Sequence, residues 1–169
     1  MHKKIEWNHI NHWYKELHED SGRRQKSALK RCKTLEEVYL QQAYVDFIKK
    51  IELKNNSSML PVIACVLAHA RPSETTSTTE CLSFEQQMAK MKNGQDSPII
   101  SLIRFRQLLV CKNENKLFRF LIRVVKQIEP FNVTAFAKDL FWWRDVKTQR
   151  KWALTYYENL PEKHLPKGS

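Results

Sequence analysis

The sequence predicts an all-α protein made of two packed small helical bundles with about eight or nine helices. Apolar residues recur at three- and four-residue spacing along most of the chain, and no stretch alternates with period two. The chain has 3 glycines among 169 residues, whereas average usage of roughly 7% would give about a dozen. Because tight hairpins need glycine at positive φ, a protein built mostly from two-residue hairpins is excluded.

The first half of the chain contains three predicted helices with clear apolar faces or caps. The first is amphipathic, and its apolar positions are Trp7, Ile10, Trp13, Tyr14 and Leu17. Thr34 and Glu37 have the spacing of a capping box, which opens a helix that continues to Ile51. The apolar segment 58–70 predicts a helix buried on most faces, and the polar segment 71–79 predicts a loop.

Two further helices are predicted on either side of a turn in the middle of the chain. Ser83 with Gln86 indicates a second capping box and a short helix that ends near Lys92, before Asn93-Gly94. Ser97-Pro98 has the pattern of a cap followed by a first helical position, so it predicts a helix from there to about residue 111.

The last three predicted helices follow one another with short connections. Asn113 or Asn115 begins the first of them, Asn132 caps the second, and the third covers 146–159. The tryptophans Trp142, Trp143 and Trp152 lie at helical spacing among other apolar residues, so packing in the core is expected for most of them. No stacking platform for bases is evident. The helices are expected to form an N-terminal subdomain (1–92) and a basic C-terminal subdomain (93–169), packed as one globular unit.

The sequence indicates a reduced cytoplasmic protein without a cofactor. The four cysteines, at positions 32, 65, 81 and 111, form no C-x-x-C pair, and no signal peptide or membrane span is evident. His9, His12 and Glu16 share a helical face, but a solvated polar face explains them better than a metal site does. His69 is expected to be a hydrogen-bonded core histidine. No recognisable nucleophile or acid–base arrangement supports an enzyme.

The positive charge is concentrated in part of the chain. There are 29 Lys+Arg against 18 Asp+Glu, which gives a formal charge of +11. Residues 1–85 have 13 against 11 (+2), and residues 86–169 have 16 against 7 (+9). A basic patch of this kind is the electrostatic footprint of a nucleic-acid-binding protein.

Basic residues also recur at helical spacing in three rows. The first is Lys112, Lys116, Arg119, Arg123 and Lys126; the second is Arg23, Lys26, Lys30 and Lys33; the third is Arg144, Lys147 and Lys151. A solvated helix face would explain one such row, but ordinary surfaces intersperse both signs of charge. Three acid-poor rows favour sequence-independent contact with a phosphate backbone.

Several motifs resemble those of one protein family. In chain order they are W-x-x-Y/L near the start, S-A-L-K-R-C (27–32), L-I-R-F-R-Q-L-L (102–109), L-F-R-F-L-I-R (117–123), D-L-F-W-W-R-D (139–145) and Q-R-K-W-A-L-T-Y-Y (149–157). Their order and spacing, from about Trp13 to Tyr157, resemble the CasB family, the small subunit of type I-E CRISPR Cascade complexes.

The resemblance implies an all-α, non-catalytic subunit in antiviral defence. Its expected partners are CRISPR RNA, the target and displaced DNA strands, the backbone and large subunits of Cascade, and a second copy of itself. The resemblance assigns nucleic-acid binding to Lys30, Arg31, Arg104, Arg106, Lys112, Arg119, Arg123, Lys147 and Arg150, and the first basic row adds Lys116.

Two other functions remain open at the level of sequence. One is a stand-alone helical DNA-binding regulator, although no compact helix-turn-helix with a glycine-containing turn is evident. The other is a scaffold for protein assembly whose basic faces meet acidic proteins.

Overall fold

A computed structural model describes residues 6–52, 57–72 and 81–166 of the protein. Within these ranges the chain forms ten α-helices, two short 3-10 helices and no strand. The elements are α1 (Asn8–His18), η1 (Asp20–Gly22), α2 (Arg23–Arg31), α3 (Leu35–Tyr39), α4 (Gln42–Ile51), α5 (Leu60–His69), α6 (Phe84–Ala89), α7 (Leu102–Leu109), α8 (Glu114–Val125), α9 (Val133–Phe141), α10 (Val146–Asn159) and η3 (Glu162–His164). The predicted all-α class is confirmed.

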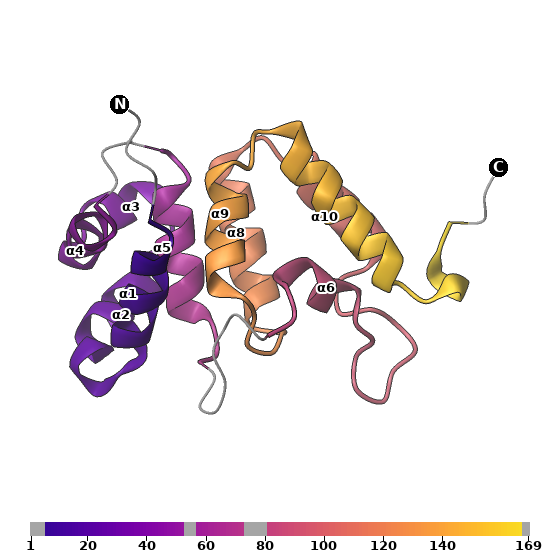
Figure 1. The fold of residues 1–169 in the computed structure, drawn as a ribbon, viewed down its shortest axis with the longest axis horizontal. Coiled ribbons are helices and arrows are strands. Elements are labelled where there is room, and N and C mark those ends of the chain that lie inside the picture. The colour runs from indigo at the N-terminus through magenta and orange to yellow at the C-terminus, as the bar shows by residue number, and fades with distance from the viewer. Residues whose placement is uncertain (1–5, 53–56, 73–80, 167–169) are drawn as a thin grey trace.

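Helix α5 lies between the N-terminal helices and the pair α8 and α9 in an elongated molecule (Figure 1). It packs against α2, α8 and α9, and its nine residues 60–68 are all buried. A helix that is hydrophobic on every face must be surrounded by other elements, which explains its position and confirms the prediction for this segment. The proposed division at residues 92 and 93 stays a prediction; α6, which precedes it, packs against α10 near the C-terminus.

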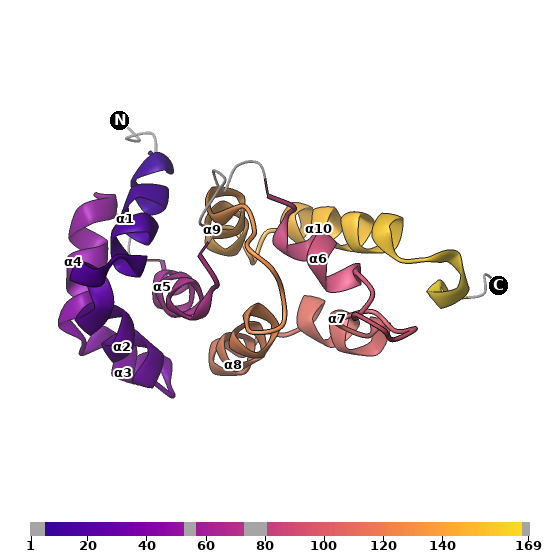
Figure 2. The ribbon, with the colours of Figure 1, turned by 90° about the horizontal axis from the view of Figure 1, so that it is seen from below.

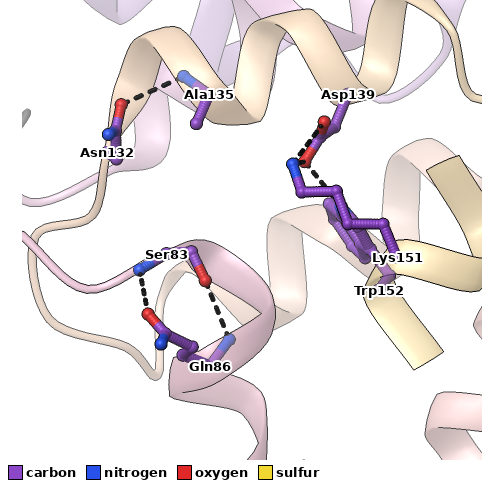
Figure 3. Close-up of polar contacts among 7 residues, drawn as sticks. All are labelled: Ser83, Gln86, Asn132, Ala135, Asp139, Lys151 and Trp152. Carbon is purple, nitrogen blue, oxygen red and sulfur yellow. Dashed lines mark hydrogen bonds and ion pairs between the residues drawn. The ribbon is translucent and has the colours of Figure 1, made fainter. Parts of the chain in front are cut away.

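The predicted N-terminal caps of α6 and α9 are confirmed (Figure 3). The Gln86 backbone N–H donates to the Ser83 hydroxyl at 3.2 Å, and the Ser83 N–H donates to the Gln86 side-chain oxygen at 2.9 Å. The Ala135 N–H donates to the Asn132 side-chain oxygen at 3.0 Å. Each bond satisfies a backbone donor that the helix itself leaves without a partner.

The structure also decides between the two asparagines offered as the start of α8. Asn113 is the cap, since its side-chain oxygen accepts the Lys116 N–H at 3.0 Å. The side-chain oxygen of Asn115 instead accepts the Leu35 N–H at 3.0 Å, and this bond ties the start of α3 to α8.

The helix predicted for 34–51 forms two helices, α3 and α4, so the described chain has ten α-helices. Thr34 caps α3 by accepting the Glu37 N–H at 3.3 Å. The Glu37 carboxylate accepts from the Lys33 N–H at 2.8 Å, one residue earlier than in a capping box. The break follows from Gln41, whose extended backbone (ψ 133°) cannot continue a helix.

The predicted helix start at Ser97-Pro98 is wrong. Helix α7 begins at Leu102, and its cap is Ser101, whose hydroxyl accepts the Arg104 N–H at 3.4 Å. Pro98 instead forms an isolated antiparallel bridge with Met91. Backbone N–H groups of residues 99 and 100 donate to the carbonyls of residues 90 and 88, so this segment is extended and the helix starts only after it.

The described ranges contain no helix that is both long enough and apolar enough to cross a membrane. Cys32 and Cys65 are buried, whereas Cys81 and Cys111 are partly exposed.

Candidate nucleic-acid interface

All ten predicted nucleic-acid-binding residues are exposed. Six other cations of the described chain form ion pairs with carboxylates, and they are Arg23, Lys50, Arg71, Arg144, Lys151 and Lys163. None of the ten predicted residues forms an ion pair with a described residue. The ten side chains are therefore exposed without a described carboxylate partner, although Arg106 Nε donates to the Tyr157 hydroxyl at 3.3 Å.

Helix α8 presents the longest basic row. Lys116, Arg119 and Arg123 are exposed along it, and Lys126 follows at its C-cap. The opposite face is buried by apolar residues, namely Leu117, Phe118, Leu121, Val124 and Val125. Lys112, which the spacing placed on this helix, lies before its cap in the connection from α7. The row is therefore helical from residue 116 onward.

Most of the predicted residues belong to helices that lie along one side of the molecule. In Figure 2, α2, α8 and α7 lie along one long side, and α9 and α10 lie along the other. Eight predicted residues belong to α2, α7, α8 or the connection before α8; we call them the basic face, and they are Lys30, Arg31, Arg104, Arg106, Lys112, Lys116, Arg119 and Arg123. The remaining two, Lys147 and Arg150, belong to α10 on the opposite side.

His69, at the end of α5, is affected by cations of both the α2 row and the α8 row. Burial is the largest cause that lowers the pKa of His69 to about 4, and the charges of Lys126 and Lys30 act in the same direction. The helices α2 and α8 both pack against α5, which carries His69 at its end. The predicted hydrogen-bonded core histidine is wrong, because His69 is partly exposed and its Nδ1 has no partner among the described residues.

The third predicted basic row is largely neutralised within the protein. Arg144 pairs with Glu114 of α8, and the Nζ atom of Lys151 donates to both carboxylate oxygens of Asp139 at 2.9 Å (Figure 3). Lys147 is the one member of that row without an ion pair to a described residue. Backbone contact by the whole row is therefore not supported.

Asp139 is the centre of a buried polar cluster between α6, α9 and α10. Besides Lys151, it accepts the Trp152 indole N–H at 2.8 Å (Figure 3). Glu85, 3% exposed, lies close by, and burial together with the Asp139 charge raises its pKa. Asp145 caps α10 by accepting the Lys147 N–H at 2.9 Å. Asp139 and Asp145 therefore have structural partners.

The three neighbouring tryptophans divide between the core and the surface. Trp143 and Trp152 are 3% and 0% exposed, which confirms the expected core packing for most of the set. Trp142 is 51% exposed and meets Phe141 edge-on.

The histidines of α1 form local ion pairs. His9 pairs with Glu6 at 3.4 Å and His12 with Glu16 at 3.1 Å, and Glu16 also pairs with Lys50 of α4. No group of three potential metal ligands occurs in the described ranges. The pairing fits a polar, solvated face.

Two partly buried imidazoles make stability depend on pH. Burial is the largest cause that lowers the pKa of both His18 and His69 to about 4, and the N–H of His18 at Nε2 donates to the Leu67 carbonyl at 3.0 Å. The unfolded chain, whose histidines have a pKa near 6.5, binds more protons than the folded protein between those values. Stability should therefore fall as the pH drops from about 6.5 to 4, by about 2 kcal/mol for each histidine once solvent screening of these half-buried rings is included.

Urea unfolding at pH 7 and pH 4.5 measures this loss, and the variant with both His18→Gln and His69→Gln is the control. Glutamine can keep the bond to Leu67 but does not titrate, so the double variant should lose clearly less stability on acidification. An identical loss in both proteins would contradict the assignment.

The sequence prediction did not find a groove between the end of α7 and the start of α8. It has a volume of about 580 Å³, and its lining includes Gln107, Val110, Lys112, Asn113, Lys116 and Phe120. We call it the α7–α8 groove. The sequence signal for it is a short break between two helices, with apolar residues and lysines in the break and next to it. Its walls come from two helices, so their packing angle is needed to form it.

Most of the chain matches a family model. Residues 25–157, from α2 to α10, match the model described as CRISPR-associated protein Cse2. A search of curated proteins found no match. The matched range covers most of the chain, and it includes every residue of the basic face. The chain therefore belongs to the CRISPR-associated protein Cse2 family, the CasB family of type I-E Cascade small subunits.

Proposed function

We propose that this protein is a non-catalytic, cytoplasmic subunit of a type I-E Cascade complex that binds nucleic acid. It would hold the guide RNA–target DNA R-loop and the displaced DNA strand through sequence-independent backbone contacts. Its proposed partners are the backbone and large subunits of the complex, CRISPR RNA, both DNA strands and a second copy of the chain.

The basic face is the observation that supports this proposal most strongly. Eight exposed cations without an ion pair to a described residue belong to α2, α7, α8 and the connection before α8, and these helices lie along one side of the molecule. Lys and Arg side chains neutralise phosphates and release counterions, which gives affinity without sequence preference. Exchange of a DNA duplex for an RNA–DNA duplex is nearly balanced in free energy, so a few such contacts can shift it toward the R-loop.

Charge reversal on α8 tests the proposal. The variant with Arg119→Glu and Arg123→Glu should bind single-stranded DNA about 10- to 100-fold more weakly at moderate salt, since two phosphate contacts are lost and two repulsions added. The slope of log K against log salt should become smaller by about 0.7 for each contact on a single strand. Fluorescence anisotropy across a salt series measures both, and R-loop lifetime in reconstituted Cascade measures the same contacts in the complex.

A matched control changes the same amount of charge elsewhere. Lys49→Glu with Lys138→Glu reverses two exposed cations on α4 and α9, and it should affect binding much less. Discrimination of one duplex sequence by more than ~10³ would favour the stand-alone regulator instead. Absence of affinity in both the free protein and the complex would leave the assembly scaffold.

A further inference from the structure

Three of the grooves on the described surface differ in the charge of their linings. The α7–α8 groove is the largest, at about 580 Å³, against about 330 Å³ and 280 Å³ for the other two. The lining of the groove of about 330 Å³ includes Glu37, and the lining of the groove of about 280 Å³ includes Asp145. The lining of the α7–α8 groove includes two lysines and no carboxylate. Its charge therefore suits an anionic ligand.

The lining of this groove also contains apolar, aromatic and amide side chains. Val110 is 74% exposed, and Phe120 is partly buried, so together they provide an apolar and an aromatic surface. Gln107 is exposed and contributes an amide. The Asn113 side-chain oxygen already caps α8, which leaves its amide N–H₂ to donate. An aromatic surface, amides and lysines together match the parts of a nucleotide: a flat base with polar edges and a phosphate.

The groove shares Lys112 and Lys116 with the basic face. Lys116 and Phe120 are four residues apart on α8, so their side chains are neighbours on the helix surface. Arg119 precedes Phe120, and Arg123 follows one turn later. A strand whose phosphates follow this row would pass the groove with its bases close to Phe120.

We propose that the α7–α8 groove seats one unstacked nucleotide of a single nucleic-acid strand. The base lies against Phe120 and Val110, the amides of Gln107 and Asn113 meet its edge, and Lys112 and Lys116 hold its phosphate. Bases in a duplex are stacked and paired, so the groove selects single-stranded over double-stranded nucleic acid. This proposal rests on the proposed function and adds a base-binding site to its backbone contacts.

Abasic strands test the groove directly. The full-length protein is titrated with a labelled thymidine strand and with a strand of equal length that lacks its bases. The intact strand should bind about tenfold more tightly, because a stacked base contributes on that order. Phe120→Leu should remove most of this difference and leave the salt dependence unchanged, since no charge is altered.

A second variant and a control keep the test independent of folding. Val110→Ser changes an exposed residue of the groove and should reduce the difference between intact and abasic strands about threefold. Ile122→Ala changes a partly buried apolar residue of the same helix outside the groove lining, and it should preserve the difference. Circular dichroism confirms helix content in all three variants.

The possible outcomes separate the groove from the basic face. Equal, salt-dependent binding of intact and abasic strands would overturn the groove proposal and retain the proposed function. Loss of salt-dependent binding altogether would overturn both. If Phe120→Leu weakens assembly with other Cascade subunits but leaves strand binding intact, the groove takes an acidic peptide and the proposal is wrong.

Discussion

Replacing Gly22 with alanine should lower the free energy of unfolding by about 3 kcal/mol. The added methyl group would overpack the corner between α1 and α2, where Gly22 lies. A Cβ atom at this position would lie 2.4 Å from the Glu16 carbonyl oxygen, 2.6 Å from the Leu17 carbonyl oxygen and 2.7 Å from the Leu17 Cα. All three are backbone atoms of the last turn of α1 (Asn8–His18), so no flexible side chain can move aside. The backbone of Gly22, with φ −91°, suits any residue, so the cost is steric.

Urea unfolding of Gly22→Ala and of Gly94→Ala separates the steric cost from a conformational one. Gly94 has φ +71° and open space around it, so alanine there should cost only about 1 kcal/mol. If the free energy of unfolding of Gly22→Ala lies within about 0.5 kcal/mol of the parent value, the close approach of α1 and α2 is contradicted. This corner also sets the direction of α2, and therefore the position of Lys30 and Arg31 on the basic face.

Removal of the Asp139 carboxylate should destabilise the protein almost as much as Gly22→Ala. Asp139→Ala leaves the indole N–H of Trp152 without its acceptor, and Trp152 is 0% exposed. It also leaves Lys151 without its ion-pair partner. We expect a loss of about 2–3 kcal/mol, mostly from the buried donor, because Lys151 is half exposed and its charge can be solvated.

Asp139→Asn is the matched variant that isolates the hydrogen bond. Asparagine keeps an oxygen for the Trp152 N–H, removes the repulsion on Glu85 and loses the charge opposite Lys151, so we expect a loss of about 1 kcal/mol. Equal losses for the two variants in urea unfolding would show that the hydrogen bond to Trp152 contributes little.

The helix starts were predictable where the signal is local. Ser83 with Gln86 and Asn132 form the bonds that their spacing indicated, because a cap joins residues only three positions apart. Ser97-Pro98 has an equally good local pattern, yet the segment is extended. There the backbone N–H groups of residues 99 and 100 donate to the carbonyls of residues 90 and 88. A cap pattern involves only neighbouring residues, so it does not predict these bonds.

The candidate site was predictable in its residue types but not in their grouping. Periodicity placed Lys116, Arg119 and Arg123 on one helix face, and the structure agrees. It placed Arg144 and Lys151 in an equivalent row, although both are paired with carboxylates. Their partners are 30 and 12 residues away in the chain, beyond the range of a helical repeat.

Composition and local pattern were sufficient for the all-α class, the caps that depend on neighbouring residues, the excess of positive charge and the resemblance to the family that the comparison confirmed. Each of these depends on residue content or on interactions within one turn of helix. The packing of the helices was needed to show which cations remain without an acidic partner, which helices bring them to the same side, and where two helices leave a groove with Phe120 in its wall. Those features involve distant segments, because the distance between two side chains from different helices is set by how the core holds the helices together.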